Sequence, residues 1–297
     1  MKVLTQATVA NFGPGFDVFG LCLNEPFDVI RIREGSRLRL KVHGFRSKVP
    51  EDPLKNVASI AALRLARMVG AEVKFEMSIH KGIRPKSGLG SSGASALGGA
   101  LAMAKLLGIE DRQRIIKAAL EGEKAASGSA HGDNVVPSLF GGFTITKSLS
   151  PLEVFRLDVD FRLVVVLPEI EISTKRARKV LPEYVPLKDA VRNVALASAL
   201  ISALNDGDIE TVGRLLDDHL AIPYRKSLMP WFDRVRNAAL ESGAYGVSIS
   251  GSGPAMFALG EGLEGIGKAM KEAFEDAGIK ADYLVVKVGG GAKCSDV

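Results

Sequence analysis

The stretch PKSGLGSSGAS, residues 85–95, constrains the fold more than any other part of the chain. A Gly-x-Gly-Ser-Ser run leads there into a predicted helix over about 92–107, with Leu97, Leu101 and Ala104 on one face. Glycines let a backbone approach a ligand closely, and the amides and dipole at a helix N-terminus favour an anion. Serine hydroxyls can bind a phosphate oxygen or a metal ion. The alternative is a Gly/Ser turn with a serine N-cap. The stretch is not a Walker A loop, because no Lys precedes the pair of serines.

A carboxylate on an apolar helix face is the second signal. In the helix predicted over 112–126, Glu123 continues a stripe made by Ile115, Ile116, Ala119 and Leu120. A buried carboxylate is unfavourable unless it is paired or bound to a metal ion. Mg²⁺ beside nucleotide phosphates typically takes one or two carboxylates. A structural ion pair, or a helix end that has reached solvent, is the alternative.

Polar residues also gather in HGDNVVP, residues 131–137, which we predict to be a loop before the FGGF turn. His131, Asp133 and Asn134 lie close together in it. Either Asp133 or His131 could serve as the base for a hydroxyl substrate. An Asx-turn that closes the preceding helix is the structural alternative.

Two further Gly-rich segments lie near the ends of the chain. VANFGPGFDVFG, residues 9–20, sets Asn11 and Asp17 among glycines, which favours either a tight turn or room for a ligand. SISGSGPAMFAL, residues 248–259, places Gly251 in a loop that is either held against something or part of a long hairpin.

Two arginines in the second half of the chain could bind an anionic group. Arg178 lies just after an apolar strand, and Arg225 lies between helices and is bracketed by prolines. A planar guanidinium suits a carboxylate or a phosphate. Each could equally be a solvated surface charge.

The pattern of apolar residues predicts two domains, residues 1–150 and 151–297, divided at the SLSP turn. In the first domain we expect strands at 28–33, 37–43 and 73–80 and a helix at 55–70. In the second we expect strands near 153–158, 162–168, 247–250, 255–260 and 283–288, and helices near 189–205, 208–219, 230–242 and 263–277. Strands separated by helices predict a sandwich built on a sheet.

The apolar runs, the cysteines and the net charge of the sequence argue against several classes of protein. No run approaches the roughly 18 apolar residues of a membrane span, and the first residues do not resemble a signal peptide. Cys22 and Cys294 lie near opposite ends with no metal-binding spacing, which fits a reducing compartment. The formal charge of +5 is scattered apart from KRARK at 175–179. We therefore expect a cytoplasmic protein that binds neither nucleic acid nor membrane.

Taken in order, ANFGPGFD, PKSGLGSSGA and SGSGPA resemble the three motifs of the GHMP kinase superfamily. The resemblance covers essentially the whole chain and is closest to the homoserine kinase family, whose pattern the following VFGLCL and HGDNVVPSLFGGF also match. The signatures of galactokinases and mevalonate kinases are not present. The resemblance implies an α+β protein. Its N-terminal domain would be like ribosomal protein S5 domain 2, its C-terminal domain would be a ferredoxin-like α/β sandwich, and ATP would lie between them.

The resemblance also implies roles for individual residues. ATP phosphates would lie on the loop of Pro85, Lys86, Ser87, Gly88, Leu89, Gly90, Ser91, Ser92, Gly93, Ala94 and Ser95, and adenine beside Asn56. Mg²⁺ would bind Ser92 and Glu123, with Ser91 as the alternative serine. L-Homoserine would be held by Asn11, Asp17, Arg178, Arg225 and Gly251, with Asp17 on the ammonium and the arginines on the carboxylate. His131 and Asn134 would lie near the reacting hydroxyl, with Arg178 beside them. A homodimer is usual in the family.

One departure from the superfamily bears on mechanism. Mevalonate-type members place an Asp base eleven positions after the Mg²⁺-binding Glu, and here that position is Asn134, after Asp133. An amide cannot take a proton, so we favour catalysis by positioning, Mg²⁺ and the helix dipole, with no dedicated base. The alternatives are another alcohol kinase, of the mevalonate pathway or for shikimate, and a non-catalytic sensor of the same fold.

Overall fold

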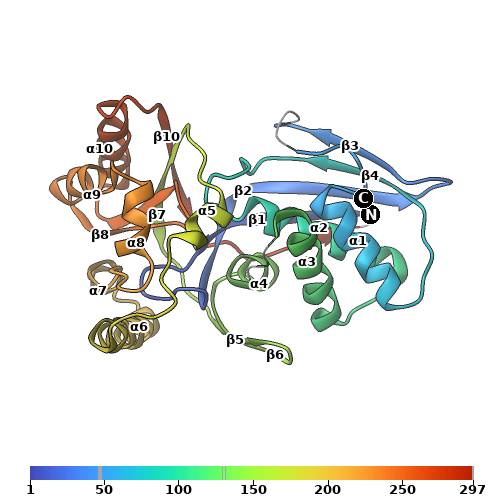
Figure 1. Cartoon of the computed structure of the whole chain (residues 1–297), viewed down its shortest axis with the longest axis horizontal. Coiled ribbons are helices and arrows are strands. Elements are labelled where there is room, and N and C mark those ends of the chain that lie inside the picture. Colours follow the sequence, from blue (N-terminus) through green and yellow to red (C-terminus); the bar gives the residue numbers. More distant parts are fainter. Residues whose placement is uncertain (46–48, 129, 131, 296–297) are drawn as a thin grey trace.

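The computed structural model describes residues 1–45, 49–128, 130 and 132–295, which form two sheets with helices packed against them (Figure 1). The seven-stranded sheet contains β1 (Lys2–Ala10), β2 (Phe19–Glu34), β3 (Arg39–His43), β4 (Phe75–His80), β5 (Phe143–Leu149), β6 (Leu152–Leu157) and β11 (Lys293–Ser295). Its strand order is β11-β1-β2-β4-β3, with β5 and β6 continuing from β2. The four-stranded sheet has the order β10-β7-β9-β8, with β7 (Arg162–Pro168), β8 (Ala244–Ile249), β9 (Met256–Gly260) and β10 (Ala281–Lys287). The α+β class predicted from sequence is confirmed.

Helices divide between the two sheets. Beside the larger sheet lie α1 (Val57–Met68), α2 (Ser91–Leu107), α3 (Arg112–Ser127) and α4 (Gly132–Phe140). The second half contains α5 (Thr174–Lys179), α6 (Leu187–Asp206), α7 (Ile209–Arg214), α8 (Ile222–Arg225), the 3-10 turn η2 (Lys226–Leu228), α9 (Phe232–Glu241) and α10 (Leu263–Glu275). Apolar residues of α9 and α10 pack on one face of the smaller sheet, and those of α6 and α7 on the other. Burial on both faces explains the continuous Val run of β7.

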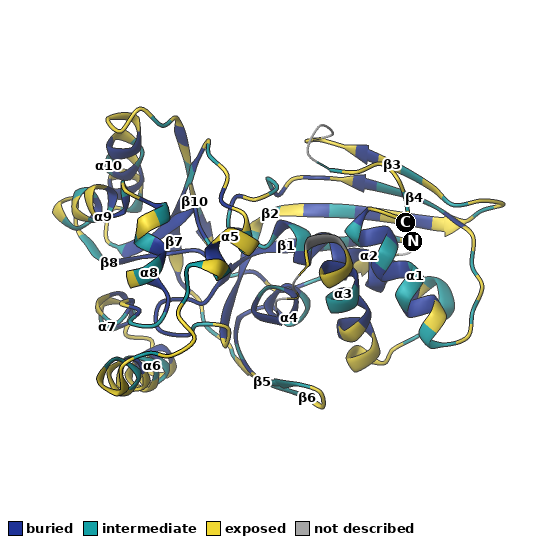
Figure 2. Cartoon of the chain, in the orientation of Figure 1, coloured by how far each residue is buried: buried dark blue, intermediate teal, exposed yellow. Residues whose placement is uncertain are grey.

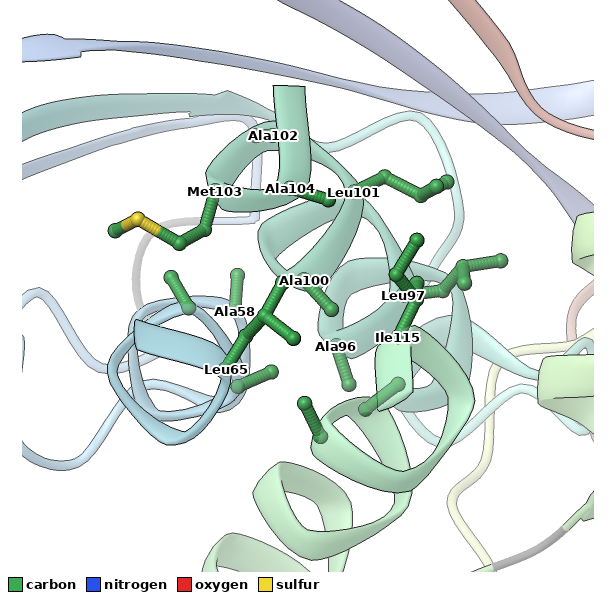
Figure 3. Packing of buried hydrophobic residues seen from close by; sticks show 14 of the residues in the cluster. Ala58, Leu65, Ala96, Leu97, Ala100, Leu101, Ala102, Met103, Ala104 and Ile115 are labelled. Carbon is green, nitrogen blue, oxygen red and sulfur yellow. The ribbon is translucent and has the colours of Figure 1, made fainter. Parts of the chain in front are cut away.

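The core of the first half is built from small residues. Ala58 and Leu65 of α1 meet Ala96 and Ala100 of α2, and Ile115 of α3 closes the cluster (Figure 3). A Cβ on Gly99 would lie 2.0 Å from the Ala58 carbonyl oxygen, so α1 and α2 can approach this closely only because residue 99 is a glycine. The position of the α2 N-terminus is thereby fixed against α1.

Aromatic rings join the two sheets. Phe12, in the loop after β1, stacks on Phe257 of β9 with ring centres 5.1 Å apart and meets Phe143 of β5 edge-on at 5.4 Å. Its side chain is fully buried. Rings in these geometries contribute about 0.5–1.5 kcal/mol per pair beyond their burial. The loop that carries Asn11 and Asp17 is therefore anchored between the two halves of the chain.

The prediction of a loop over 131–137 is wrong, because residues from Gly132 onward form α4. Gly, Asp, Asn and Pro favour turns in isolation, but Val135 and Val136 are fully buried against neighbouring strands and helices. Tertiary burial outweighs these local preferences. His131 lies outside the described residues. The helix predicted over 208–219 is shorter, ending at Arg214.

The chain passes from the seven-stranded to the four-stranded sheet after residue 150, the predicted domain boundary. Residue 150 lies in the turn between β5 and β6, and both strands belong to the seven-stranded sheet. The first strand of the other sheet begins at Arg162, and β11 returns to pair with β1. The division of the chain into two domains at residue 150 stays a prediction.

The helices and the two cysteines can be compared with the predictions of no membrane span and no metal-binding cysteines. Among the helices of the described residues, none is both long and apolar enough to span a bilayer. Cys22 is buried, Cys294 is exposed, and no disulfide joins these two described residues. Burial raises the pKa of Cys22 to about 12, so this side chain remains a thiol.

A buried ion pair fixes the start of α2. Lys81 and Asp28 are both buried and bind each other through Nζ and Oδ2. Lys81 Nζ also donates to Ser91 Oγ at 2.8 Å and to Ser95 Oγ at 2.9 Å. Asp28 Oδ1 accepts the backbone N–H groups of Gly82 and Ile83, each at 3.1 Å. Burial lowers the pKa of Lys81, and the Asp28 charge opposes that shift.

Removing one member of this pair should destabilise the fold strongly. Lys81→Met or Asp28→Asn leaves the partner charge buried, so we expect the free energy of unfolding to fall by about 3–5 kcal/mol. The double variant Lys81→Met/Asp28→Asn should lose less than the sum of the two single changes. Guanidinium unfolding measures this, with Lys105→Met, an exposed lysine at the other end of α2, as control. Single variants as stable as the control would contradict the assigned role.

Candidate active site

A cavity of about 390 Å³ lies where both halves of the chain meet. Sixteen residues selected from the sequence line it, namely Asn11, Asp17, Asn56, Pro85, Lys86, Gly88, Gly90, Ser91, Ser92, Ser95, Glu123, Asp133, Asn134, Arg178, Arg225 and Gly251. Ser87, Leu89, Gly93 and Ala94 are buried behind the lining. The fold thus brings together segments that are far apart in the sequence.

The loop before α2 turns its carbonyl groups into the protein. Three consecutive carbonyl oxygens have protein donors: Ser87 O accepts Ala255 N–H (3.1 Å), Gly88 O accepts Ser250 Oγ (2.7 Å) and Leu89 O accepts Thr8 N–H (3.2 Å). These three carbonyl oxygens of the loop are therefore not available to repel an anion in the cavity. This is the backbone arrangement that an anion-binding loop needs.

Gly90 is the N-cap of α2 and has a φ of 66°. No side chain caps the first turn of the helix, so its amides and dipole can act on a ligand. A Cβ at position 90 would lie 2.2 Å from Thr8 Oγ1 and 2.6 Å from Asn134 Oδ1. Both the backbone conformation and the close approach require glycine here.

Ser92 and Glu123 meet at the edge of this loop. Ser92 Oγ donates to Glu123 Oε1 at 2.8 Å, and Glu123 is 2% exposed. Ser91 is used otherwise, because its Oγ donates to Ile83 O at 2.9 Å and accepts from Lys81. A hydroxyl and a carboxylate are donors that suit Mg²⁺. No group of three or more His, Cys, Asp or Glu side chains that could hold a metal ion occurs among the described residues.

Asp133 and Asn134 begin α4 and face the same cavity. Asn134 Oδ1 accepts a hydrogen bond from Thr8 Oγ1 at 2.9 Å, so its NH₂ group is the part that can serve a ligand, as a donor. Burial raises the pKa of Asp133 to about 7, and the charges of Asp17 and Glu123 add to the shift. Asp133 therefore titrates near neutral pH.

A second cluster of charges lies at the other end of the cavity. Arg178 donates Nη1 to Asp17 Oδ2 and Nη2 to Asp17 Oδ1, each at 2.6 Å. Asn11 holds this loop, because its Oδ1 accepts the Asp17 N–H at 3.0 Å. The guanidinium carbons of Arg178 and Arg225 each lie 5.3 Å from the centre of the Phe16 ring.

Arg225 is held more firmly than Arg178. It is 3% exposed, and its Nη1 donates to Gly251 O at 2.9 Å. Asn11 Nδ2 donates to the same oxygen at 3.0 Å, so both lone pairs of Gly251 O have protein partners. Arg225 Nε has no hydrogen-bond partner among the described residues. A buried guanidinium with an unused donor can take a carboxylate.

Asn56 shapes the far wall of the cavity. As the N-cap of α1, its Oδ1 accepts the Ala58 N–H at 3.0 Å, and its Nδ2 donates to Pro50 O at 2.8 Å. Both ends of the amide therefore bind the protein itself. Val49, Pro50 and Val57 line the cavity beside it and give an apolar surface for a flat ring.

No sequence pattern singles out Lys81, Thr8 or Phe16. Lys81 lines the cavity directly after the buried strand β4, and this place at a strand end was the available signal. Phe16 stands next to Asp17 in a motif already selected, but its ring contacts come from residues more than 150 positions away. Thr8 looks like an ordinary strand residue.

Comparison with known proteins identifies the family. The model for the GHMP kinases N terminal domain matches residues 56–142, and that for the GHMP kinases C terminal domain matches 200–280. A homoserine kinase from Pyrococcus furiosus is 61% identical over 99% of this chain and 99% of its own length. One from Methanocella arvoryzae is 40% identical over 99% of this chain and 96% of its own.

Solved structures agree. The crystal structure of homoserine kinase from Cytophaga hutchinsonii superposes with a TM-score of 0.91 at 38% identity, covering 99% of this chain and 96% of that one. Mevalonate kinase of L. major shares the fold, with a TM-score of 0.73 at 16% identity over 98% of this chain and 96% of that one. The family predicted from the three glycine-rich motifs is confirmed. The chain belongs to the GHMP kinase family and, within it, to the homoserine kinases.

Proposed function

We propose that this protein transfers the γ-phosphoryl group of ATP to the hydroxyl of L-homoserine, giving O-phospho-L-homoserine, a step toward threonine. The observation that carries the proposal is the distribution of groups in one cavity. One end offers the uncapped start of α2 to an anion, and the other offers two guanidinium groups and a carboxylate to a small zwitterion.

The nucleotide would occupy the end formed by α1 and α2. Its phosphates would lie on the amides of the loop of residues 85–95, and its base on the apolar wall beside Asn56. Ser92 and Glu123 would hold Mg²⁺, which when bound neutralises charge on the phosphates. A pair of protein oxygens is enough, because Mg²⁺ usually completes its shell with substrate phosphates and water.

The amino acid would occupy the end formed by the Asn11–Asp17 loop, α5 and α8. Asp17 suits the ammonium group, and Arg178 with Arg225 suits the carboxylate. The hydroxyl would then lie toward Asn134, whose NH₂ group can orient it. Orientation of this kind contributes much of the rate in phosphoryl transfer.

The reaction would run without a dedicated base. Asn134 has only a donor left for a ligand, and Asp133 lies among the like charges of Asp17 and Glu123. The raised pKa of Asp133 makes it the competing candidate, since a base works best when its pKa is near the operating pH. His131 lies outside the described residues.

A substrate panel tests the proposed activity. With Mg·ATP and a coupled ADP assay, kcat/KM should be highest for L-homoserine, because it alone in the panel carries an ammonium, a carboxylate and a terminal hydroxyl. Mevalonate and shikimate serve as the competing substrates. Higher kcat/KM for either would redirect the assignment to another GHMP kinase, and no turnover of any substrate would favour a non-catalytic sensor.

The base-free mechanism predicts unequal effects at two buried carboxylates. Asp133→Asn should keep kcat within about tenfold of wild type, whereas Glu123→Ala should lose at least about 100-fold, because it removes a group proposed to hold the metal ion. Glu121→Ala, a partly exposed residue on the same helix that does not line the cavity, is the control. A loss of about 100-fold or more in Asp133→Asn, together with loss of a kcat transition near pH 7, would identify Asp133 as the base.

The same variant should also change the pH dependence of stability. Because the pKa of Asp133 is raised to about 7, the folded protein binds this proton more tightly than the unfolded chain does. Its stabilising contribution is complete below about pH 4 and is lost as pH rises through about 7. Relative to wild type, Asp133→Asn should therefore gain about 2–3 kcal/mol in free energy of unfolding between about pH 5 and pH 8.

We further propose that the enzyme is a cytoplasmic homodimer that binds neither nucleic acid nor membrane. The support for a dimer is α6, much of whose surface is exposed (Figure 2). Its Leu187, Val191 and Val194 are at least 60% exposed, and Tyr184 lies just before them. Exposed apolar patches of this kind are typical of protein interfaces. The need for ATP, and the absence of a metal-binding spacing around Cys22 and Cys294 in the sequence, support the cytoplasm.

If α6 forms the interface, a charge there should separate the subunits. Val191→Asp should yield a monomer in size-exclusion chromatography with light scattering, because a carboxylate would be buried in an apolar contact. Phe155→Asp, an equally exposed apolar residue on β6, should leave the mass unchanged. A wild-type monomer, or a Val191→Asp dimer, would contradict this surface.

A further inference from the structure

The two side chains that we propose to bind the charged groups of the substrate form an ion pair with each other in this structure. Arg178 and Asp17 form a two-point contact, with both N···O distances at 2.6 Å. This fork geometry is a strong form of ion pair. An α-amino acid carries the same two kinds of charge on one carbon atom. Its ammonium is equivalent to the guanidinium that Asp17 now holds, and its carboxylate is equivalent to the carboxylate that Arg178 now holds.

We propose that the substrate binds by ion-pair exchange: its ammonium replaces Arg178 at Asp17 while its carboxylate replaces Asp17 at Arg178. This inference rests on the proposed function and adds the basis of its selectivity. A ligand with both charges supplies a new partner to each side chain. A ligand with one charge compensates one side chain and leaves the other without its partner. The pair therefore selects zwitterionic alcohols over anionic or cationic ones.

The position of the Arg178–Asp17 pair allows the two side chains to separate. The side chains of Arg178 and Asp17 are 35% and 39% exposed, so water screens their attraction and can solvate them during exchange. They also come from separate segments, α5 and the loop after β1, so they can part without disturbing a shared element. A fully buried pair such as Lys81–Asp28 could not be exchanged in this way.

Arg225 provides the fixed half of the carboxylate site. It is buried, bonded to Gly251 O, and packed on the same Phe16 ring as Arg178. Burial is the main cause of a lowered pKa of Arg225; the charge of Asp218 opposes this shift, and repulsion from the like charge of Arg178 adds to it. A carboxylate between them would relieve that repulsion. Arg178 is then the partner that moves, and Phe16 is the ring against which both guanidinium groups are oriented.

Two truncated ligands separate exchange from simple charge attraction. 4-Hydroxybutanoate lacks the ammonium and 3-aminopropan-1-ol lacks the carboxylate. Dissociation constants for both, and for L-homoserine, are measured by NMR titration against wild type, Asp17→Asn, Arg178→Gln and the control Arg176→Gln. The control residue is exposed on the same helix and is not part of the cavity lining.

Exchange predicts opposite effects for whole and truncated ligands. Asp17→Asn should weaken L-homoserine by at least about 30-fold and tighten 4-hydroxybutanoate by about threefold or more, because Arg178 no longer has to leave a carboxylate. Arg178→Gln should likewise weaken L-homoserine and tighten 3-aminopropan-1-ol. Variants that leave the truncated ligands unchanged or weaken them would overturn the exchange.

Failure of the proposed function is distinguishable from failure of the exchange. The wild-type sample used for the titrations is also assayed for turnover of L-homoserine. The result of that assay does not depend on how either variant behaves. Turnover without the predicted tightening rejects the exchange alone, whereas absent turnover rejects the proposed function.

Discussion

The buried contact between Lys81 and Asp28 is the interaction on which the rest of the site depends. It ties β2 and β4 to the first two turns of α2 through Ser91 and Ser95. Because this pair takes up the hydroxyl of Ser91, only Ser92 of the adjacent serines presents its hydroxyl to Glu123. A charged pair is a costly way to hold a helix, but its many hydrogen bonds define one orientation. That orientation determines where the helix start faces.

The second constraint is the anchoring of the loop after β1. Phe12 is buried among rings of both sheets, and Asn11 bonds to Gly251 in the second half of the chain. The same loop then presents Phe16 and Asp17 to α5 and α8. The loop after β1 thus fixes the position of Arg178 and Arg225, from the second half of the chain, relative to the start of α2 in the first half. In the proposed reaction, that relation sets the distance between the hydroxyl and the transferred phosphoryl group.

Sequence patterns predicted the parts of the site that depend on local chemistry. The glycines and serines before α2 and the position of Glu123 on an apolar stripe were sufficient to select them, and the structure brings them to one cavity. The roles of Lys81 and Phe16 were not predictable, since their partners are distant in sequence. The helix α4 was missed because its turn-forming residues are held helical by the burial of Val135 and Val136. Most strands were predicted because alternation in a half-buried sheet is a local signal.

In the proposed reaction two ligands meet across this cavity, the nucleotide at the start of α2 and the amino acid between Asp17 and Arg178. A crystal structure with Mg²⁺, a non-hydrolysable ATP analogue and L-homoserine tests it most directly. We predict that the phosphates contact the loop of residues 85–95, the ammonium contacts Asp17, the carboxylate contacts Arg178 and Arg225, and Asp17 and Arg178 no longer touch. Homoserine bound elsewhere, or bound while Asp17 and Arg178 remain joined, would contradict it.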